Sequence, residues 1–362
     1  MISVQINSEE SYQIAVQHDA NQEITAYLNT HFSGRKALIF IDERVAKFHI
    51  SDYMKLLNGT KLGSVGLTTI PEGESSKSFS MYEQLVSEAL EADLKRSDVI
   101  IAIGGGVTGD LAGFVAATVL RGVHLIHLPT SLLAMVDSSV GGKTGINHTT
   151  GKNRIGAFYQ PDAIFMELKR LETLEQKEWM AGFGEVLKYG CISNPEIIDS
   201  AKKSIAQKFV IDENVRSIIE SSVKIKADIV QQDEKESGIR AFLNFGHTTA
   251  HAIERVMEYG TVAHGVAVFM GMITELELSR LKGGLKRSDQ LDLLVDDYRN
   301  YVPDLKNLAI NDLIQAMSYD KKNMAAGTTF VLLNDMAQPY VTSDVDQQDI
   351  SRSLSLMINR FS

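Results

Sequence analysis

The sequence predicts an α/β domain with a mostly parallel sheet, followed by an all-α domain. Short, uninterrupted apolar runs recur through the first half with helical stretches between them, as in a parallel sheet covered on both faces. After about Leu171 these runs stop and helical periodicity continues. The length of 362 residues also exceeds one ordinary core. We therefore place a domain boundary near residue 165, which gives domains 1–165 and 166–362.

The expected elements of the first domain begin with a hairpin, because short alternating runs flank a polar turn. Its two strands cover residues 3–6 and 12–16. Buried strands are expected at residues 37–42, 67–71, 99–103, 124–129 and 163–168, with a helix such as 81–94 between two of them. In the second domain, apolar residues at helical spacing predict helices at residues 211–236, 247–257 and 266–281.

Composition and charge exclude several classes of protein. The apolar fraction of 44% and the charged fraction of 23% are typical of a soluble globular protein. No stretch approaches the roughly 18 apolar residues of a transmembrane helix, and the first ten residues lack a signal sequence. The net charge of −10 argues against a nucleic-acid partner. The single cysteine, Cys191, excludes an internal disulfide and a thiolate zinc cluster, so we expect a cytoplasmic protein.

A glycine-rich turn follows the third of the buried strands, with the pattern Gly104-x-Gly106-x-x-Gly109 at the start of a helix. Free backbone N–H groups and the helix dipole favour an anion there, such as the pyrophosphate of a dinucleotide. The ribose-binding acid expected about twenty residues later is missing, so the site would follow a different pattern, with Asp42 as the candidate acid. The alternative is a tight turn that binds no ligand.

Polar and glycine residues are dense between residues 129 and 161. The motif Gly142-Lys143-Thr144 in this segment is not a nucleotide-phosphate loop, because Asp137 occupies the position of the first glycine of that loop. The prediction of an ATPase therefore fails. Lysines beside glycine and asparagine instead indicate an anion-binding segment, and a solvated loop is the alternative.

Two further positively charged residues are candidates for binding an anion. Lys226 falls on the apolar face of the helix predicted at 211–236, so its side chain either extends to solvent along that face or points into a site. Arg240 lies seven residues before His247 and adds a second positive charge to the same part of the sequence.

Histidines and a carboxylate predict a metal centre. His247 and His251 are four residues apart and would project from one face of a helix. His264 follows after a short break, and Glu185 lies upstream. A carboxylate and neutral imidazoles are the ligands of a catalytic zinc that keeps one position open for substrate. The alternative is surface histidines and a solvated carboxylate, but Gly246 stands where a surface helix would carry a charged residue.

Four motifs occur in a fixed order along the chain, at residues 104–110, 137–153, 184–190 and 243–247. Together they resemble the 3-dehydroquinate synthase family, and the likeness runs from about residue 37 to residue 322. The first motif is shared with glycerol dehydrogenase-like relatives. The resemblance implies an NAD-dependent, zinc- or cobalt-dependent lyase of the shikimate pathway. Such an enzyme converts 3-deoxy-D-arabino-heptulosonate 7-phosphate into 3-dehydroquinate and phosphate.

The resemblance also implies a role for each matching position. The metal ligands would be Glu185, His247 and His264, which leaves His251 for the substrate phosphate. His264 would thus replace His251 as the second histidine ligand. The positions that match NAD-binding residues are Asp42, Glu72, Lys77, Gly105, Gly106, Asp110, Thr130 and Ser131, together with Asp137, Lys143 and Lys152. The positions that match substrate-binding residues are Asp137, Lys143, Lys152, Asn153, Lys188, Lys226, Arg240, Asn244, His251 and one of Lys321 or Lys322.

The sequence departs from the family pattern at three places. Ser131 stands where a second threonine is usual, which keeps the hydroxyl. Thr249-Ala250 replaces a common Phe-Gly, and Val266 replaces a common glutamate. The last two affect the surroundings of the metal ligands and leave the ligands themselves in place.

The implied reaction explains why NAD and a metal occur together. Transient oxidation of a carbinol makes the adjacent C–H acidic, so that phosphate can be eliminated; re-reduction and an aldol closure follow. NAD would then be regenerated in each turnover.

Arg121 leads to a prediction about oligomeric state. The helix that begins at Gly106 is expected to run to about Leu120, or roughly 20 Å, so Arg121 would lie at the edge of the sheet opposite to the ligand-binding edge. The family nevertheless supplies an arginine to the substrate phosphate from this position. Both statements hold if a neighbouring subunit provides it, which predicts a homodimer with shared sites. The alternative is a cation at a helix C-terminus that only favours the dipole.

Two other functions remain as alternatives. A sibling sugar-phosphate cyclase, acting on a substrate without the carboxylate, would share the fold, NAD and metal. A non-catalytic protein that binds NAD and metal would not need every lysine of the anion-binding segment. The expected partner is an anionic sugar phosphate, with no nucleic acid and no membrane.

Overall fold

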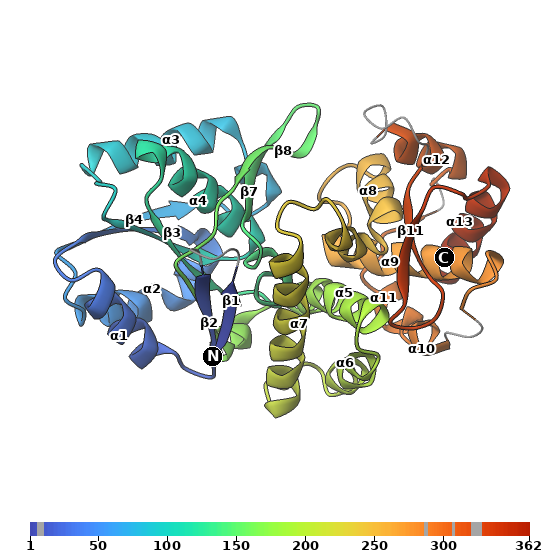
Figure 1. Cartoon of the computed structure of the whole chain (residues 1–362), viewed down its shortest axis with the longest axis horizontal. Helices are drawn as coiled ribbons and strands as arrows, with labels where there is room; N and C mark the ends of the chain where they lie inside the picture. Colours follow the sequence, from blue (N-terminus) through green and yellow to red (C-terminus); the bar gives the residue numbers. More distant parts are fainter. Residues whose placement is uncertain (6–10, 286–288, 306–307, 320–327) are drawn as a thin grey trace. The chain divides into compact units, whose positions relative to one another are not determined.

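The computed structural model describes residues 1–5, 11–285, 289–305, 308–319 and 328–362 (Figure 1). The chain forms two compact units. The first contains Met1–Leu174 and Lys226–Glu234, and the second contains Glu175–Ile225 and Lys235–Ser362. The units therefore divide slightly later than the boundary expected near residue 165, and a short segment from the second half of the chain belongs to the first unit.

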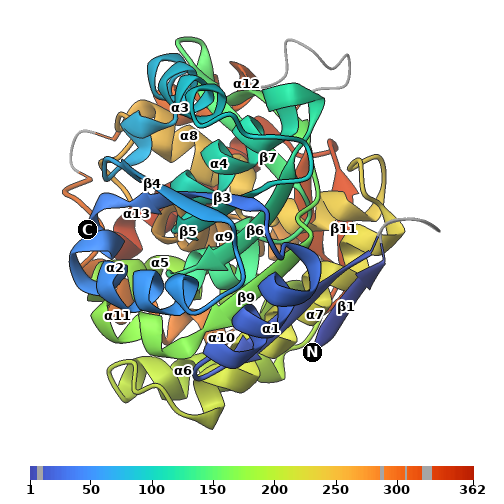
Figure 2. The same ribbon diagram turned by 90° about the vertical axis from the view of Figure 1, so that its left-hand side faces the viewer.

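The first unit is built on a seven-stranded sheet with the order β1-β2-β9-β6-β5-β3-β4. Figure 2 shows β4, β3, β5, β6 and β9 following one another across this sheet. All neighbouring strands are parallel except β1 and β2, which form the predicted hairpin. Each predicted strand of the first domain is confirmed, and residue 6 of the expected hairpin lies outside the described residues. The strands are β1 (Ile2–Gln5), β2 (Ser11–Gln17), β3 (Lys36–Asp42), β4 (Ser64–Ile70), β5 (Val99–Gly104), β6 (His124–Pro129) and β9 (Ala163–Glu167).

Helices cover both faces of this sheet, because alternate side chains of the buried strands point to opposite faces. Ile39 and Ile41 of β3 join a core with α1 (Asn21–His31) and α2 (Glu43–Asn58). Leu38 and Phe40 of the same strand join a second core with α3 (Phe79–Glu91) and α4 (Gly106–Thr118). Figure 1 shows these two helix pairs on opposite sides of the strands. The glycine-rich turn before α4 therefore lies at the carboxyl edge of the sheet, where ligands bind in open α/β folds.

A second, two-stranded sheet occupies the polar segment between residues 129 and 161. It consists of β7 (Lys143–His148) and β8 (Gly151–Phe158), which pair in antiparallel register. The sequence did not predict this hairpin, because glycine and polar residues interrupt the alternation of apolar residues that identifies a strand. Gly145 and Gly156 face each other in it, and a Cβ on Gly156 would overlap the carbonyl oxygen of Thr144. The hairpin carries Lys143, Lys152 and Asn153 at defined positions.

The second unit is mostly helical, and the three helices predicted there are confirmed as α7, α8 and α9. The expectation that no strand follows residue 171 is wrong, since Phe330–Leu333 (β10) pairs with Pro339–Thr342 (β11). The helices are α5 (Gln176–Ile192), α6 (Glu196–Ala206), α7 (Glu213–Gln232), α8 (His247–Val256), α9 (His264–Leu281), α10 (Asp289–Asp292), α11 (Val295–Arg299), α12 (Ile310–Tyr319) and α13 (Gln347–Phe361). None of the helices in the described residues is long and apolar enough to span a membrane.

Candidate functional site

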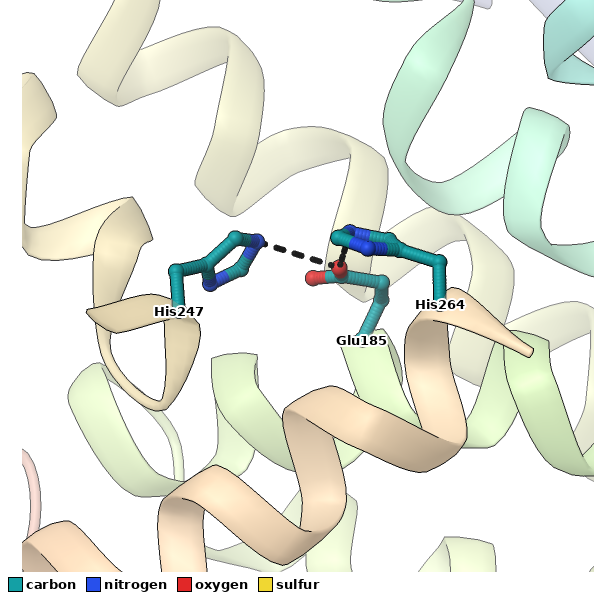
Figure 3. Close-up of side chains that lie close together, drawn as sticks. All are labelled: Glu185, His247 and His264. Atoms are coloured by element: carbon teal, nitrogen blue, oxygen red, sulfur yellow. Dashed lines mark ion pairs between the residues drawn. The ribbon is translucent and has the colours of Figure 1, made fainter. Parts of the chain in front are cut away.

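Three helices of the second unit bring the predicted metal ligands together (Figure 3). Glu185 lies on α5 and is completely buried, whereas His247 and His264 are the first residues of α8 and α9. The ion pairs join one carboxylate oxygen, Oε1 of Glu185, to Nε2 of His247 at 3.5 Å and to Nε2 of His264 at 3.4 Å. The donor atoms of these three residues all lie within 4.8 Å of one another.

The donor separations fit a tetrahedral metal ion. With metal–ligand bonds of about 2.0–2.1 Å, two donors of a tetrahedral site lie roughly 3.4 Å apart. The two oxygen–nitrogen separations at Glu185 match this value. The site also combines one carboxylate with two imidazoles, which is a ligand set of catalytic zinc sites with an open fourth position. The residues present therefore fit the metal that the sequence predicts.

Charges around the three ligands are balanced within the unit. Burial opposes ionisation of Glu185, but Lys188 and His247 outweigh it and hold the pKa of this carboxyl well below its ordinary value. Lys188 is buried one turn along α5 and forms an ion pair with Oε2 of Glu185. Burial alone would lower the pKa of His264, yet the carboxylates of Glu254 and Glu185 raise it to about 10. The site thus holds an ionised, completely buried carboxylate beside Lys188 and two histidines.

Two close helix crossings set the positions of the ligands. A Cβ on Gly265 would overlap the carbonyl oxygen of Ala181, so α5 and α9 contact each other beside Glu185 and His264. A Cβ on Gly271 would overlap the carbonyl oxygen of Gly246, so α9 also contacts the start of α8. The glycines that the sequence places next to the ligands are therefore required by backbone-to-backbone contact, which is not a property of surface helices.

Gly265→Ala tests the first crossing. The added methyl group meets backbone and cannot be relieved by a side-chain rotation, so we expect destabilisation by about 3 kcal/mol, the upper end of overpacking costs, and loss of the metal site. Urea unfolding followed by the fluorescence of Trp179, a buried residue of α5, measures the effect. Gly283→Ala is the control, because a Cβ there meets no atom within 4 Å and only its φ of 78° is strained. Equal stability of the two variants would contradict the argument.

The structure also places the other residues of the second unit that the sequence analysis singled out. The ring of His251 is 5.6 Å from that of His247 and 6.2 Å from that of His264, and His251 is not part of the three-ligand group. Arg240 is buried, and Nδ2 of Asn244 donates to Oε1 of Glu236 at 2.8 Å. The departures Thr249, Ala250 and Val266 are all completely buried. Lys321 and Lys322 lie outside the described residues.

Glu254 is a neighbour of the metal ligands that the sequence did not single out. This buried residue of α8 lies with Oε1 3.4 Å from Nδ1 of His264, on the opposite ring nitrogen from the one that faces Glu185. A carboxylate there fixes the ring orientation and raises ligand basicity. The sequence feature that could have identified Glu254 is its position two turns after His247 on the same helix.

In the first unit, a buried lysine joins two predicted binding residues. Lys77 donates from Nζ to Oδ2 of Asp110 at 2.7 Å and to Oδ1 of Asn153. Burial would lower the pKa of Lys77, but Asp110 and Glu74 together raise it. Asn153 has a φ of 54°, a conformation that favours glycine. The structure therefore places residues predicted for NAD and for substrate in one hydrogen-bonded cluster.

Asn147 holds this cluster together, and the sequence assigned it no role. Its backbone N–H donates to the carbonyl of Lys77 at 2.8 Å, and its Nδ2 donates to Oε1 of Glu74 at 2.8 Å. Its Oδ1 accepts the backbone N–H of Asn153 at 2.9 Å. Asn147 thereby attaches the β7–β8 hairpin to the short helix at Glu74–Ser76.

Lys226 belongs to the first unit, and its side chain is buried there and does not extend to solvent. Its Nζ donates to the backbone carbonyl and to Oδ1 of Asp137, both at 2.7 Å. Asp137 lies in a short helical segment at Ala134–Ser138. Lys143 is exposed at the start of β7, and Lys152 is half-buried in β8.

The glycine-rich turn at the start of α4 lies among polar residues. Gly105 is the residue before α4, and a Cβ there would approach Oγ of Ser131 to 3.5 Å. The backbone N–H of Thr130 donates to the carbonyl of Gly104 at 2.9 Å, which holds the end of β6 beside this turn.

Two acidic residues predicted for NAD lie on separate elements of this unit. Oδ1 of Asp42 accepts the backbone N–H groups of Arg44 and Val45 and so caps α2. Glu72 is exposed and pairs with Arg44 at 3.5 Å. Arg44 therefore links the start of α2 to the segment that carries Glu72.

Comparisons with known proteins agree with this arrangement. Residues 67–181 match the family described as 3-dehydroquinate synthase N-terminal, and residues 182–323 match 3-dehydroquinate synthase C-terminal. The 3-dehydroquinate synthase of Desulforamulus reducens is 40% identical over 348 residues, which is 95% of this chain and 97% of the relative. That of Salinibacter ruber is 43% identical over 321 residues, covering 87% and 86%.

Solved structures with lower identity share the fold. A 2-epi-5-epi-valiolone synthase from Streptomyces hygroscopicus with NAD+ and Zn2+ bound has a TM-score of 0.86 at 22% identity, covering 99% of each chain. A 2-deoxy-scyllo-inosose synthase complexed with carbaglucose-6-phosphate, NAD+ and Co2+ has a TM-score of 0.85 at 24% identity, covering 98% of each chain. Since the curated relatives match at well over 30% identity along most of their length, this chain belongs to the 3-dehydroquinate synthase family.

Proposed function

We propose that this protein converts 3-deoxy-D-arabino-heptulosonate 7-phosphate into 3-dehydroquinate and phosphate. The observation that carries the proposal is the convergence of Glu185, His247 and His264, with the Glu185 carboxylate at tetrahedral separations from both histidines, in a chain of this family. The sibling cyclases among the solved structures are only 22–24% identical to this chain, whereas relatives named 3-dehydroquinate synthase reach 43%. We therefore favour the 3-dehydroquinate synthase activity over that of a sibling cyclase.

NAD and a divalent zinc or cobalt ion are the proposed cofactors. When bound, NAD would accept a hydride from the substrate and return it within the same turnover. The metal would polarise the carbinol oxygen during both transfers. The chain would hold the pyrophosphate at the backbone amides of Gly105 and Gly106, because these begin α4 and have no partner in the preceding turn. The first unit would thus be the NAD-binding domain, and the second the metal- and substrate-binding domain.

The cations predicted for the substrate would bind its anionic groups. In the first unit, Asn147 and Lys77 fix Asn153, so its side chain is oriented before substrate arrives. In the second unit, Lys188 is restrained by its ion pair with Glu185. We assign phosphate or carboxylate binding to Lys143, Lys152, Asn153, Lys188, Lys226, Arg240, Asn244 and His251.

Release of phosphate from the heptulosonate phosphate tests the function. We expect multiple turnovers in the presence of NAD and metal, and loss of activity with a chelator that is reversed by zinc or cobalt. A sibling cyclase would release phosphate only from a sugar phosphate that lacks the carboxylate. A non-catalytic protein would bind NAD and metal but release phosphate from neither compound.

The stoichiometry of NAD separates this activity from that of a dehydrogenase. Since substrate and products are at the same overall oxidation level, we expect phosphate in large excess over enzyme with only a trace of NAD present. Absorbance at the wavelength of NADH, followed alongside phosphate, checks this prediction. Accumulation of NADH in proportion to phosphate would indicate a dehydrogenase related to the glycerol enzymes instead.

We further propose a cytoplasmic homodimer in which Arg121 acts across the interface. Arg121 lies in the short helix Val119–Arg121 after α4, which begins at the carboxyl edge of the sheet, so about 20 Å of helix separates it from the glycine-rich turn. The helix α4 itself ends at Thr118, slightly before the expected end at Leu120. Leu120 and Arg121 have φ values of 53° and 65°, and each such residue costs about 1–2 kcal/mol. The distance of Arg121 from the glycine-rich turn, together with its match to a family position that binds the substrate phosphate, supports its delivery by a partner subunit.

A further inference from the structure

The turn that carries Arg121 has an unfavourable backbone conformation. Leu120 and Arg121 both lie in the left-handed region, with φ values of 53° and 65°, and Gly122 follows with a φ of 117°. Residues other than glycine rarely adopt this conformation, so contacts with the rest of the unit must hold the turn. The side chain of Leu120 packs against the core beneath α3 and α4, whereas Arg121 is exposed. The turn therefore exposes Arg121 while its neighbour stays in the core.

Two side chains bond the backbone on either side of Arg121. Nε of Arg96 donates to the carbonyl of Leu120 at 2.7 Å, and Oη of Tyr159 donates to the carbonyl of Val123 at 2.6 Å. Arg96 is exposed, so water competes for its bond. Tyr159 is half-buried, and its ring packs against the same core as Leu120. Tyr159 is therefore the more firmly held of the two restraints.

Tyr159 also contacts the turn at Gly122 and the segment before β7. A Cβ on Gly122 would approach the Tyr159 hydroxyl to 3.3 Å, so a side chain there would push the hydroxyl and the turn apart. The backbone N–H of Tyr159 donates to the carbonyl of Gly142 at 2.8 Å. Tyr159 thus connects the start of β7, which carries Lys143, with the turn that carries Arg121.

We propose that Tyr159 is a positioning residue for Arg121, and that its hydroxyl acts in this way on the substrate site of the neighbouring subunit. The inference rests on the proposed homodimer, in which Arg121 binds the substrate phosphate across the interface. A guanidinium on a restrained turn loses less conformational freedom on binding than one on a mobile loop. Because Tyr159 acts through Arg121 and not by contact with the substrate, its effect depends on which subunit carries it.

Tyr159→Phe removes the hydroxyl but keeps the ring and the backbone bond to Gly142. It is added to one chain or the other of a mixed dimer of Arg121→Ala and His247→Ala. Only the chain with intact His247 has a working site, and its arginine comes from the other chain. Tyr159→Phe in the arginine-donating chain should lower kcat/KM for the heptulosonate phosphate by about 3–10-fold, as the loss of one hydrogen bond allows. In the chain that already lacks Arg121, it should change kcat/KM by less than about twofold.

Tyr27→Phe is the matched control. The hydroxyl of Tyr27 also donates to a backbone carbonyl, that of Asp162 at 3.1 Å, which lies outside the turn. Burial and the charge of Asp162 raise the pKa of both tyrosines to about 12, so both hydroxyls stay protonated near neutral pH. Tyr27→Phe should lower the stability to urea about as much as Tyr159→Phe, but leave kcat/KM within about twofold in either chain.

Hydrogen exchange gives a second measurement that does not need activity. The backbone N–H groups of Gly122 and Val123 donate to the carbonyls of Val119 and Ala116, both at 3.0 Å. If the Tyr159 hydroxyl holds the turn, these amides should exchange about 3–10-fold faster in Tyr159→Phe than in Tyr27→Phe. Equal exchange in the two variants would overturn the proposal.

The outcomes of the activity assay separate this inference from the proposed function. If the unaltered protein releases no phosphate, the proposed activity and the role of Tyr159 both fail. If the unaltered protein is active but demonstrated mixed dimers are inactive, the shared site and the role of Tyr159 fail, while the activity stands. If the mixed dimers are active and Tyr159→Phe lowers kcat/KM equally from either chain, or from neither, only the role of Tyr159 fails.

Discussion

His264→Ala should lose its bound metal and its phosphate-releasing activity while remaining folded. His264 is the first residue of α9 and only partly buried, so removing its ring leaves no large cavity. The site would keep only Glu185 and His247, whereas open catalytic zinc sites use three protein ligands. We expect the affinity for zinc to fall by more than the roughly 100-fold associated with residues that only support a ligand. Metal analysis after gel filtration, together with a phosphate-release assay, measures both effects.

His251→Ala is the matched control for this variant. His251 lies one turn from His247 on α8 and outside the three-ligand group. Because we assign it to the substrate phosphate, the variant should keep its metal and lose turnover. Full metal occupancy in His264→Ala, or loss of metal from His251→Ala, would show that the ligands have been assigned incorrectly.

Mixing two inactive variants, Arg121→Ala and His247→Ala, should restore activity if subunits exchange. In a mixed dimer, the site with intact His247 receives Arg121 from the partner, and the other site lacks both. Random exchange of equal amounts would make half of the dimers mixed, so activity should return to about a quarter of that of the unaltered protein. This change in phosphate-releasing activity is large, because both starting preparations are inactive. Phosphate release before and after exchange under mild denaturant measures the effect.

Formation of mixed dimers must be shown separately, for example with two different affinity tags. Mixed dimers without activity would contradict the shared site and leave Arg121 as a cation at the end of α4. A protein that is monomeric at assay concentrations would contradict the dimer itself. Activity of Arg121→Ala alone would show that this side chain is not needed for turnover.

The sequence predicted the first unit well because the central strands of its sheet are buried on both faces. Runs such as those that form β3 and β5 are continuously apolar and can be recognised without their partners. The β7–β8 hairpin was missed because its strands carry glycine and polar residues that pack on each other's backbone. The β10–β11 hairpin was missed because each strand has only four residues. Strands of this kind depend on tertiary contacts that local patterns do not contain.

Local spacing in the sequence predicted only part of the candidate metal centre. The interval between His247 and His251 indicated a shared helix face, but His251 lies outside the group that the structure brings together. Glu185 and His264 were also candidates because of their ligand chemistry, but only the family resemblance selected His264 over His251 as the partner of His247.

The assignment of Lys226–Glu234 to the first unit has a consequence for synthesis on the ribosome. The sheet is complete once β9 has paired with β2, a contact between residues such as Ala15 and Phe165. At that stage Asp137 still lacks Lys226, its partner in the finished unit, because that lysine is translated later, after α5 and α6. The sheet can therefore form as an early intermediate, while the segment around Asp137 reaches its final state only when much of the second unit has been translated. A gene fragment ending at Leu174 would accordingly encode the strands of this unit without the contacts that Lys226 and Glu234 make with Asp137 and Gln160.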